Sequence, residues 1–157
     1  MTSDRQESAS GAAAPSAVAG QPGAVVAEVA KKWTFDAAHH LPDHDGKCRN
    51  EHGHTYTVEV SVWGVVQPTR GRSDDGMVLD FGDLSRVWKS AIEPLLDHRD
   101  LNETVGARGC WPTTAENLAH WIGESFIDSG VEVAAVSVWE TPTSRVTARW
   151  GPGRDVG

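Results

Sequence analysis

A dense group of histidines limits what this chain can fold into more than any other feature of its sequence. His52 and His54 are two residues apart and precede the run 55–62, in which polar and apolar residues alternate. In an extended strand, alternate side chains project from the same face, so we expect both imidazoles to lie side by side. His39 ends an earlier apolar-rich run. Proteins hold a catalytic zinc ion with three neutral imidazoles and an open fourth position, so these residues predict a Zn²⁺ site.

Cys48 lies between these histidines, and the residues alone leave its function open. As a fourth ligand it would close the site and make the zinc structural. It would otherwise be a free thiol beside the metal. Lys47 and Arg49 flank it. They are either solvated loop residues or a positive environment that attracts phosphate and stabilises a thiolate.

Two motifs in this segment resemble those of a known family. Phe35 to His39 reads aromatic-x-Ala-Ala-His, and Cys48 to His54 reads Cys-x-x-x-His-Gly-His. Both resemble the family of 6-pyruvoyl- and 6-carboxy-tetrahydropterin synthases, and the resemblance extends over about residues 29 to 150. It implies that His39, His52 and His54 hold the zinc. It also implies that Cys48 is a catalytic base rather than a ligand.

A helix and a charged pair follow in the middle of the chain. From about Gly82, apolar residues recur at helical spacing, which predicts a helix with one apolar face. Asp97 and His98 come directly after it, where a histidine cation could simply favour the negative helix end. However, Leu96 to Asn102 resembles the family motif Leu-Asp-His-x-x-Leu-Asn. The resemblance implies that His98 is a proton relay and that Asp97 orients or activates it.

A second helix is predicted to begin at a capping box formed by Thr113 to Glu116 and to run through about Asp128. Capping alone explains these residues, but the run Pro-Thr-x-x-Glu-Asn also resembles the family's helix start that helps to hold the pterin. The resemblance therefore implies Thr113 and Thr114 as substrate contacts. Cys110, in the preceding loop, is interpreted as structural.

Glu140 ends a third long strand that begins at Val131 and shares a face with Val136 and Val138. A carboxylate among buried neighbours needs a partner, so a salt bridge is one interpretation. The resemblance implies instead that Glu140 anchors the pterin ring by accepting hydrogen bonds from its amino and ring N–H groups. Arg145 to Trp150 is predicted to be the last strand.

The order of these elements predicts the fold. A first strand is predicted over Val25 to Leu41, before the strand that carries His52. The turn-rich segment Gln67 to Gly76 then predicts a hairpin-type connection into the short apolar run Met77 to Phe81. The two strands that this connection joins are expected to be antiparallel neighbours. The order ββααββ indicates an α+β fold, with an antiparallel four-stranded sheet and both helices on one face. The resemblance implies the tunnelling fold, whose subunits close into a β-barrel as trimers that stack into a hexamer, with active sites at subunit boundaries.

Composition bounds the rest of the interpretation. The 157 residues fit one domain, 24–151, between a disordered N-terminal extension, 1–23, and a loose C-terminal end, 152–157. A net charge of −8 argues against a nucleic-acid partner, and no apolar run is long enough to span a membrane. The N-terminal residues lack the pattern of a secretory signal, and two cysteines are too few for a disulfide framework, so we expect a cytoplasmic protein.

For function, the resemblance implies an enzyme that acts on 7,8-dihydroneopterin triphosphate. The three residues between Cys48 and His52 favour the 6-carboxy-tetrahydropterin synthase branch, which releases triphosphate and acetaldehyde in queuosine or 7-deazapurine synthesis. Pyruvoyl-type members have a longer gap. A third branch, which trims dihydroneopterin derivatives, carries a glutamate where Arg49 stands, and Glu51 is in a different register.

Two alternatives remain at this stage. One is the 6-pyruvoyl-tetrahydropterin synthase activity or that of a related dihydroneopterin-processing lyase. The other is a non-catalytic zinc module for assembly, in which Cys48 is the fourth ligand. The module leaves Asp97, His98 and Glu140 without a function.

Overall fold

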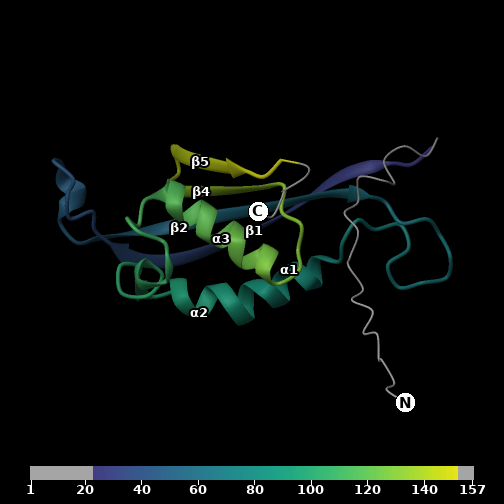
Figure 1. Ribbon diagram of the computed structural model, residues 1–157, viewed down its shortest axis with the longest axis horizontal. Helices are drawn as coiled ribbons and strands as arrows, with labels where there is room; N and C mark the ends of the chain where they lie inside the picture. The colour runs from purple at the N-terminus through teal and green to yellow at the C-terminus, as the bar shows by residue number, and fades with distance from the viewer. Residues whose placement is uncertain (1–22, 152–157) are drawn as a thin grey trace, which may run out of the picture.

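The computed structural model describes residues 23–151, which form one sheet with helices packed against one of its faces (Figure 1). The sheet has five strands in the order β3-β1-β2-β4-β5. The strands are β1 (Val26–His39), β2 (His52–Val65), β3 (Arg99–Asp100), β4 (Ala135–Thr141) and β5 (Ser144–Arg149). The helices are α1 (Phe81–Val87), a π-helical turn (Trp88–Ile92), α2 (Glu93–Leu96) and α3 (Ala115–Asp128), with short 3₁₀ turns at Lys47–Arg49 and Gly106–Arg108.

The prediction of a sheet with four antiparallel strands is wrong in one respect. The two-residue strand β3 adds a fifth member, and it runs parallel to β1, which makes the sheet mixed. The sheet of one chain is open, with β3 and β5 at its edges. The predicted β-barrel would need further copies of the chain and stays a prediction. The predicted extension, 1–23, lies outside the described residues except for Gly23, and the predicted C-terminal end, 152–157, lies wholly outside them.

The hairpin of β1 and β2 is the longest pairing in the sheet. Its antiparallel register runs from Val26 opposite Val65 to His39 opposite His52. Alternate residues of both strands face the helices, because side chains alternate along a strand. Among them, Phe35 and Tyr56 are buried and stack with ring centroids 4.9 Å apart.

The segment after β2 does not lead into another strand. β2 continues through Gly64 to Val65, and the chain then forms a loop in which the Gln67 N–H donates to the carbonyl of Met77. The side chain of Asp75 accepts three backbone N–H groups, from residues 70 to 72, and so fixes the loop. The predicted apolar run 77–81 therefore packs as a loop and ends in the first residue of α1.

The first predicted helix is present but divided. Its apolar stripe is confirmed, since Leu84, Trp88, Ile92 and Leu96 are all fully buried. Between α1 and α2 the helix widens into the π-helical turn, two residues before Pro94. Proline lacks an N–H group and cannot continue the hydrogen-bond ladder of a helix, which explains the interruption.

The second helix, α3, begins one residue later than the predicted capping box. Its N-cap is Thr114, whose hydroxyl accepts from the N–H of Asn117 at 3.3 Å, whereas Thr113 is buried. The predicted end near Asp128 is confirmed. The chain then turns at Gly130, which has a φ of +86° that favours glycine.

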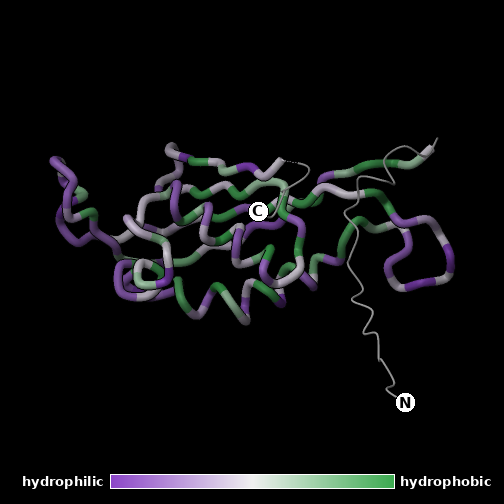
Figure 2. The backbone as a smooth tube through the Cα atoms, viewed as in Figure 1, coloured by the Kyte–Doolittle hydropathy of each residue, from purple (hydrophilic) through white to green (hydrophobic). Residues whose placement is uncertain are grey.

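The core lies between the sheet and the helices. Trp33 of β1 stacks on Trp88 with centroids 4.8 Å apart, and Val58, Val136 and Val138 have no exposed surface. Hydrophobic residues are found along the strands and helices, whereas the loop between β1 and β2 and the loop between β2 and α1 are mostly hydrophilic (Figure 2). No helix of the described residues is long and apolar enough to cross a membrane.

Candidate active site and metal centre

Three histidines converge where the β1–β2 hairpin ends. His39 is the last residue of β1, and His52 and His54 open β2 on the same face of the sheet. Their ring centroids are 4.7 to 5.3 Å apart. One potential ligand atom from each ring lies within 4.8 Å of the others, a spacing at which the three could hold one ion. We call these three residues the histidine triad.

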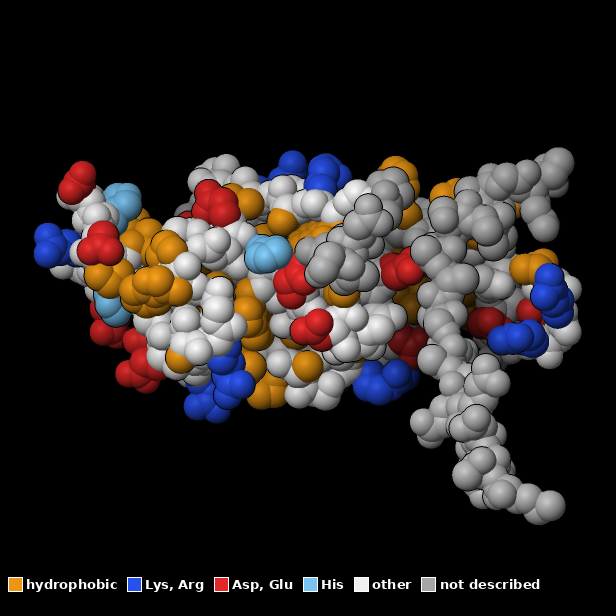
Figure 3. Space-filling view, in the orientation of Figure 1, with side chains coloured by type: hydrophobic (Ala, Val, Ile, Leu, Met, Phe, Trp, Pro, Cys, Tyr) orange, Lys and Arg blue, Asp and Glu red, His pale blue; other side chains and the backbone are white. Residues whose placement is uncertain are grey.

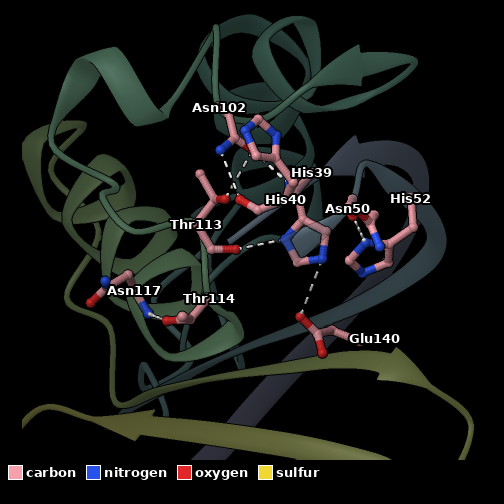
Figure 4. A network of polar contacts seen from close by, with 9 residues as sticks. All are labelled: His39, His40, Asn50, His52, Asn102, Thr113, Thr114, Asn117 and Glu140. Carbon is pink, nitrogen blue, oxygen red and sulfur yellow. Dashed lines mark hydrogen bonds and ion pairs between the residues drawn. The ribbon is translucent and has the colours of Figure 1, made fainter. Parts of the chain in front are cut away.

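The backbone orients two of these rings (Figure 4). The Nδ1 of His39 lies 2.8 Å from the carbonyl of Thr113, and the Nδ1 of His52 lies 2.8 Å from the carbonyl of Asn50. A carbonyl only accepts, so each Nδ1 carries the proton and each Nε2 keeps its lone pair for a metal. The Nε2 of His39 is buried and has no hydrogen-bond partner among residues 23–151, as expected for an atom that binds a metal ion. The donor set therefore fits a metal.

Burial of His39 also favours the form that binds a metal. Loss of water around the imidazole lowers the pKa of His39, and the hydrogen bond to Thr113 opposes this effect only in part. A neutral imidazole is therefore preferred, and only the neutral ring has a lone pair to donate.

Glu140 lies beside the triad. It follows Trp139 at an irregularity in the pairing of β4 with β5, and one of its carboxylate oxygens is 4.0 Å from the Nε2 of His39. Its side chain is 30% exposed. A cavity of about 620 Å³ opens here, lined by Glu140 and His54 together with Lys32 and Trp139. Of the triad, only His54 lines this cavity, and a ligand there would touch the carboxylate of Glu140.

Cys48 and its basic neighbours lie on the loop between β1 and β2. Cys48 is a half-buried free thiol in the 3₁₀ turn, and its carbonyl accepts from the N–H of Leu41 at 2.8 Å. The cluster of potential metal ligands found among the described residues does not include it. Lys47 and Arg49 are exposed. Charged and histidine side chains gather at this end of the molecule (Figure 3).

Asp97 and His98 lie together, but away from the triad of the same chain. Their side chains are 2.9 Å apart, and both residues bind the backbone of Asp36 in β1. The hydrogen bond from the Asp36 N–H, helped by His98, lowers the pKa of Asp97. His98 is 77% exposed. Asp36 precedes His39 by three residues, roughly 10 Å along the strand, and among the described residues no hydrogen bond or ion pair joins Asp97 or His98 to the triad.

Comparison with known proteins identifies the group to which this arrangement belongs. The 6-pyruvoyl tetrahydropterin synthase family matches residues 28–150. The chain belongs to this family. It is 32% identical over 135 residues to the 6-carboxy-5,6,7,8-tetrahydropterin synthase of Haemophilus influenzae, covering 74% of this chain and 94% of that protein. It is 40% identical over 119 residues to the 6-carboxy-5,6,7,8-tetrahydropterin synthase of Synechocystis, covering 73% and 86%.

A solved member of the synthase family has the same fold. The structure of 6-pyruvoyl tetrahydropterin synthase from Caenorhabditis elegans superposes with a TM-score of 0.69 at 28% sequence identity. The superposition covers 81% of this chain and 97% of that chain.

Within this member of the synthase family, Thr113 and Thr114 make structural contacts. Thr113 is 1% exposed, its carbonyl holds His39, and its hydroxyl donates to the side chain of Asn102 at 3.1 Å. Thr114 caps α3.

Sequence reasoning missed two residues at the site. Asn102 was visible only as the last residue of the Leu-Asp-His-x-x-Leu-Asn motif. Tyr56 shares a face with His52 and His54, and its buried hydroxyl has no hydrogen-bond partner. Its ring lies edge-on to those of His39 and His54.

Proposed function

We propose that this member of the synthase family is a zinc-dependent 6-carboxy-5,6,7,8-tetrahydropterin synthase, a lyase. It would convert 7,8-dihydroneopterin triphosphate to 6-carboxytetrahydropterin with loss of triphosphate and acetaldehyde, for queuosine or other 7-deazapurine synthesis. The observation that carries the proposal is the histidine triad with oriented Nε2 atoms beside the carboxylate of Glu140. The names of the bacterial relatives and the short gap between Cys48 and His52 support this branch.

The metal would be held by His39, His52 and His54. Three imidazole nitrogens with an open fourth position suit a catalytic Zn²⁺. When bound, zinc supplies a Lewis acid that acidifies the hydroxyls of the substrate side chain. The absence of Cys48 from the ligand cluster supports an open site.

Glu140 and Cys48 would act directly on the substrate. Glu140 accepts hydrogen bonds from the adjacent amino and ring N–H groups of the pterin, a geometry that a carboxylate matches with its two oxygens. This anchors the ring at Glu140, beside the triad. Cys48 then moves a proton at the side-chain carbon next to the ring. The exposed Arg49, with Lys47, provides positive charge for the triphosphate.

The pair Asp97 and His98 would serve the site of a neighbouring subunit. Within one chain His98 is exposed, and Asp36, to which the pair binds, lies roughly 10 Å along β1 from His39, which favours a site other than the chain's own triad. A trimer or hexamer with active sites at subunit boundaries would bring it against the triad of the next copy. There, His98 would relay protons and Asp97 would hold the imidazole in orientation.

Identification of the products after incubation with 7,8-dihydroneopterin triphosphate tests the proposal. We expect 6-carboxytetrahydropterin, acetaldehyde and triphosphate, measured by mass spectrometry and by trapping of the aldehyde. No turnover by the zinc-loaded protein would contradict it.

A second candidate, 6-pyruvoyl-tetrahydropterin synthase, is favoured by the likeness to the Caenorhabditis elegans structure. It predicts a product that keeps the three side-chain carbons, with no acetaldehyde. The same assay separates the two activities. The non-catalytic zinc module predicts neither product and requires Cys48 to bind the metal.

A further inference from the structure

We propose that Asn102 is a positioning residue for the metal ligand His39. Its side-chain amide makes three hydrogen bonds that connect separate parts of the chain. The Oδ1 of Asn102 accepts from the N–H of His40 at 3.0 Å and from the hydroxyl of Thr113 at 3.1 Å. Its Nδ2 donates to the carbonyl of His40 at 2.8 Å. Asn102 ends the motif that carries Asp97 and His98, and the catalytic assignment gives it no function of its own.

The amide continues the sheet past the end of β3. Backbone pairing of β3 with β1 joins Ala38 to Asp100, and the N–H of Leu101 then donates to the carbonyl of Ala38 at 2.9 Å. At His40 the side chain of Asn102 takes the place of the next backbone pair, with one donor and one acceptor. His39 is therefore held between two residues whose backbones are both tied to this segment.

The same amide also controls the ring of His39 through Thr113. The carbonyl of Thr113 takes the Nδ1 proton of His39, and the hydroxyl of Thr113 is fixed on Asn102. Thr113 and His39 are 1% and 2% exposed, so water is not available to replace a lost bond. One side chain thus sets both the backbone position and the ring orientation of the ligand.

The ligand His52 does not depend on such a long connection. The ring of His52 is held by the carbonyl of Asn50, two residues earlier in the same loop. Asn102, by contrast, is 62 residues from His40 in the sequence. Loss of the amide should therefore release His39 selectively. Partners that hydrogen-bond a ligand directly, as Thr113 does, affect metal affinity by about 10- to 100-fold, and Asn102 acts on His39 through this partner and through the backbone of His40.

The test measures zinc binding rather than turnover. The full chain is stripped of metal, and the affinity for Zn²⁺ is measured by competition with a chelator. The absorption spectrum of the Co²⁺-loaded protein reports the ligand geometry. We expect Asn102→Ala to weaken zinc binding by about 10- to 100-fold and to change the Co²⁺ spectrum.

Thr104→Val is the matched control. Thr104 lies two residues after Asn102. Its hydroxyl donates to the carbonyl of Leu95 in α2 at 2.7 Å, with the carbonyl of Asp100 in β3 as a second acceptor at 3.1 Å, but the residue has no such bond to β1. This variant should lower the melting temperature of the metal-free protein and leave zinc affinity unchanged. An equal loss of zinc affinity in this control would show that general loosening of the loop is responsible, and would overturn the proposal.

A second pair of variants keeps the test valid if Asn102→Ala does not fold. Thr113→Val removes the hydroxyl that binds Asn102 but keeps the carbonyl, and should weaken zinc binding. Thr113→Ser keeps the hydroxyl and should restore the affinity. Unchanged affinity and spectra in Asn102→Ala, or in Thr113→Val, would overturn the inference.

The inference rests on the proposed metal site. A wild-type protein that binds zinc while Asn102→Ala binds it equally well would overturn this inference alone. A wild-type protein that binds no zinc would overturn the proposed function as well.

Discussion

At the scale of single residues, the hydrogen bonds of the imidazole rings decide which nitrogen faces a metal. Thr113 and Asn50 each accept an Nδ1 proton, which leaves the Nε2 of His39 and of His52 free. Whether Cys48 is a metal ligand or a base is also a question about single residues. The possible metal ligands among the described residues are three imidazoles without Cys48, and in the proposed mechanism the thiol is the base.

Replacing Cys48 tests this division. Cys48→Ala should abolish product formation and leave zinc bound, because three imidazoles suffice to hold the metal. Zinc stoichiometry and product formation are measured on the same sample. Loss of zinc together with loss of stability would show that Cys48 is a ligand. A fully active, zinc-replete variant would remove Cys48 from the mechanism.

Protonation of His39 predicts a pH dependence of the metal-free protein. Burial lowers the pKa of His39 below its ordinary value of 6.5. Well above pH 6.5 the ring is neutral in both the folded and the unfolded chain, so its protonation does not change the free energy of unfolding there. Below that pH the unfolded chain takes up a proton first, so the free energy of unfolding should fall as the pH falls. Melting temperatures measured from about pH 8 to pH 5 should show this decline. His39→Gln has no titrating ring, so its melting temperature should depend less on pH. An identical pH dependence would show that His39 is not the group responsible.

At the scale of elements, the close packing of loop 66–80 on β2 shows why the strand keeps a glycine. A Cβ atom on Gly64 would lie 2.6 Å from the Cγ1 of Val78, closer than carbon atoms can approach. The loop therefore packs against the strand where a side chain would otherwise project. The segment 77–80 takes its place in the fold from this contact rather than from strand pairing.

Gly64→Ala should therefore destabilise the protein by about 1–3 kcal/mol, the usual cost of overpacking. Urea unfolding of the metal-free chain measures the change. Val78→Ala removes the obstructing methyl groups, so the double variant Gly64→Ala/Val78→Ala should recover part of the loss relative to the sum of the single variants. Strictly additive losses would show that the two residues do not collide.

At the scale of the whole molecule, a single chain holds the components of the proposed site in two places. The triad, Glu140 and Cys48 gather at one end of the β1–β2 hairpin. Asp97 and His98 are exposed on the edge of β1. One edge of the sheet is the short strand β5, and the other is β1, of which β3 pairs only with Ala37 and Ala38. Association of several copies is the arrangement that would complete the proposed site.

Mixing two inactive variants tests this association. Cys48→Ala lacks the base, and His98→Ala should lower the rate by about 10²–10⁴-fold because the relay is gone, while zinc stays bound. If the pair serves a neighbouring subunit, oligomers refolded from both variants should regain part of the activity. Each variant refolded alone is the control. No recovery in oligomers shown to be mixed would place all of these residues in the site of one chain.

Local periodicity was sufficient to predict much of this molecule. The two-residue spacing of His52 and His54 put both rings on one face, and the helical stripe from Leu84 to Leu96 predicted the buried face of the first helix. Both signals come from residues that are close in sequence, where the geometry of a strand or a helix alone decides which side chains share a face.

Only the tertiary structure decided the remaining contacts. A strand of two residues such as β3 has no periodicity to detect, so the fifth strand and its parallel direction could not be predicted. The hydrogen bonds of Asn102 to His40 and of His39 to Thr113 join residues 62 and 74 positions apart, and no local pattern encodes them. The distance of Asp97 and His98 from the triad was likewise invisible, because it depends on where the end of α2 meets β1 in three dimensions.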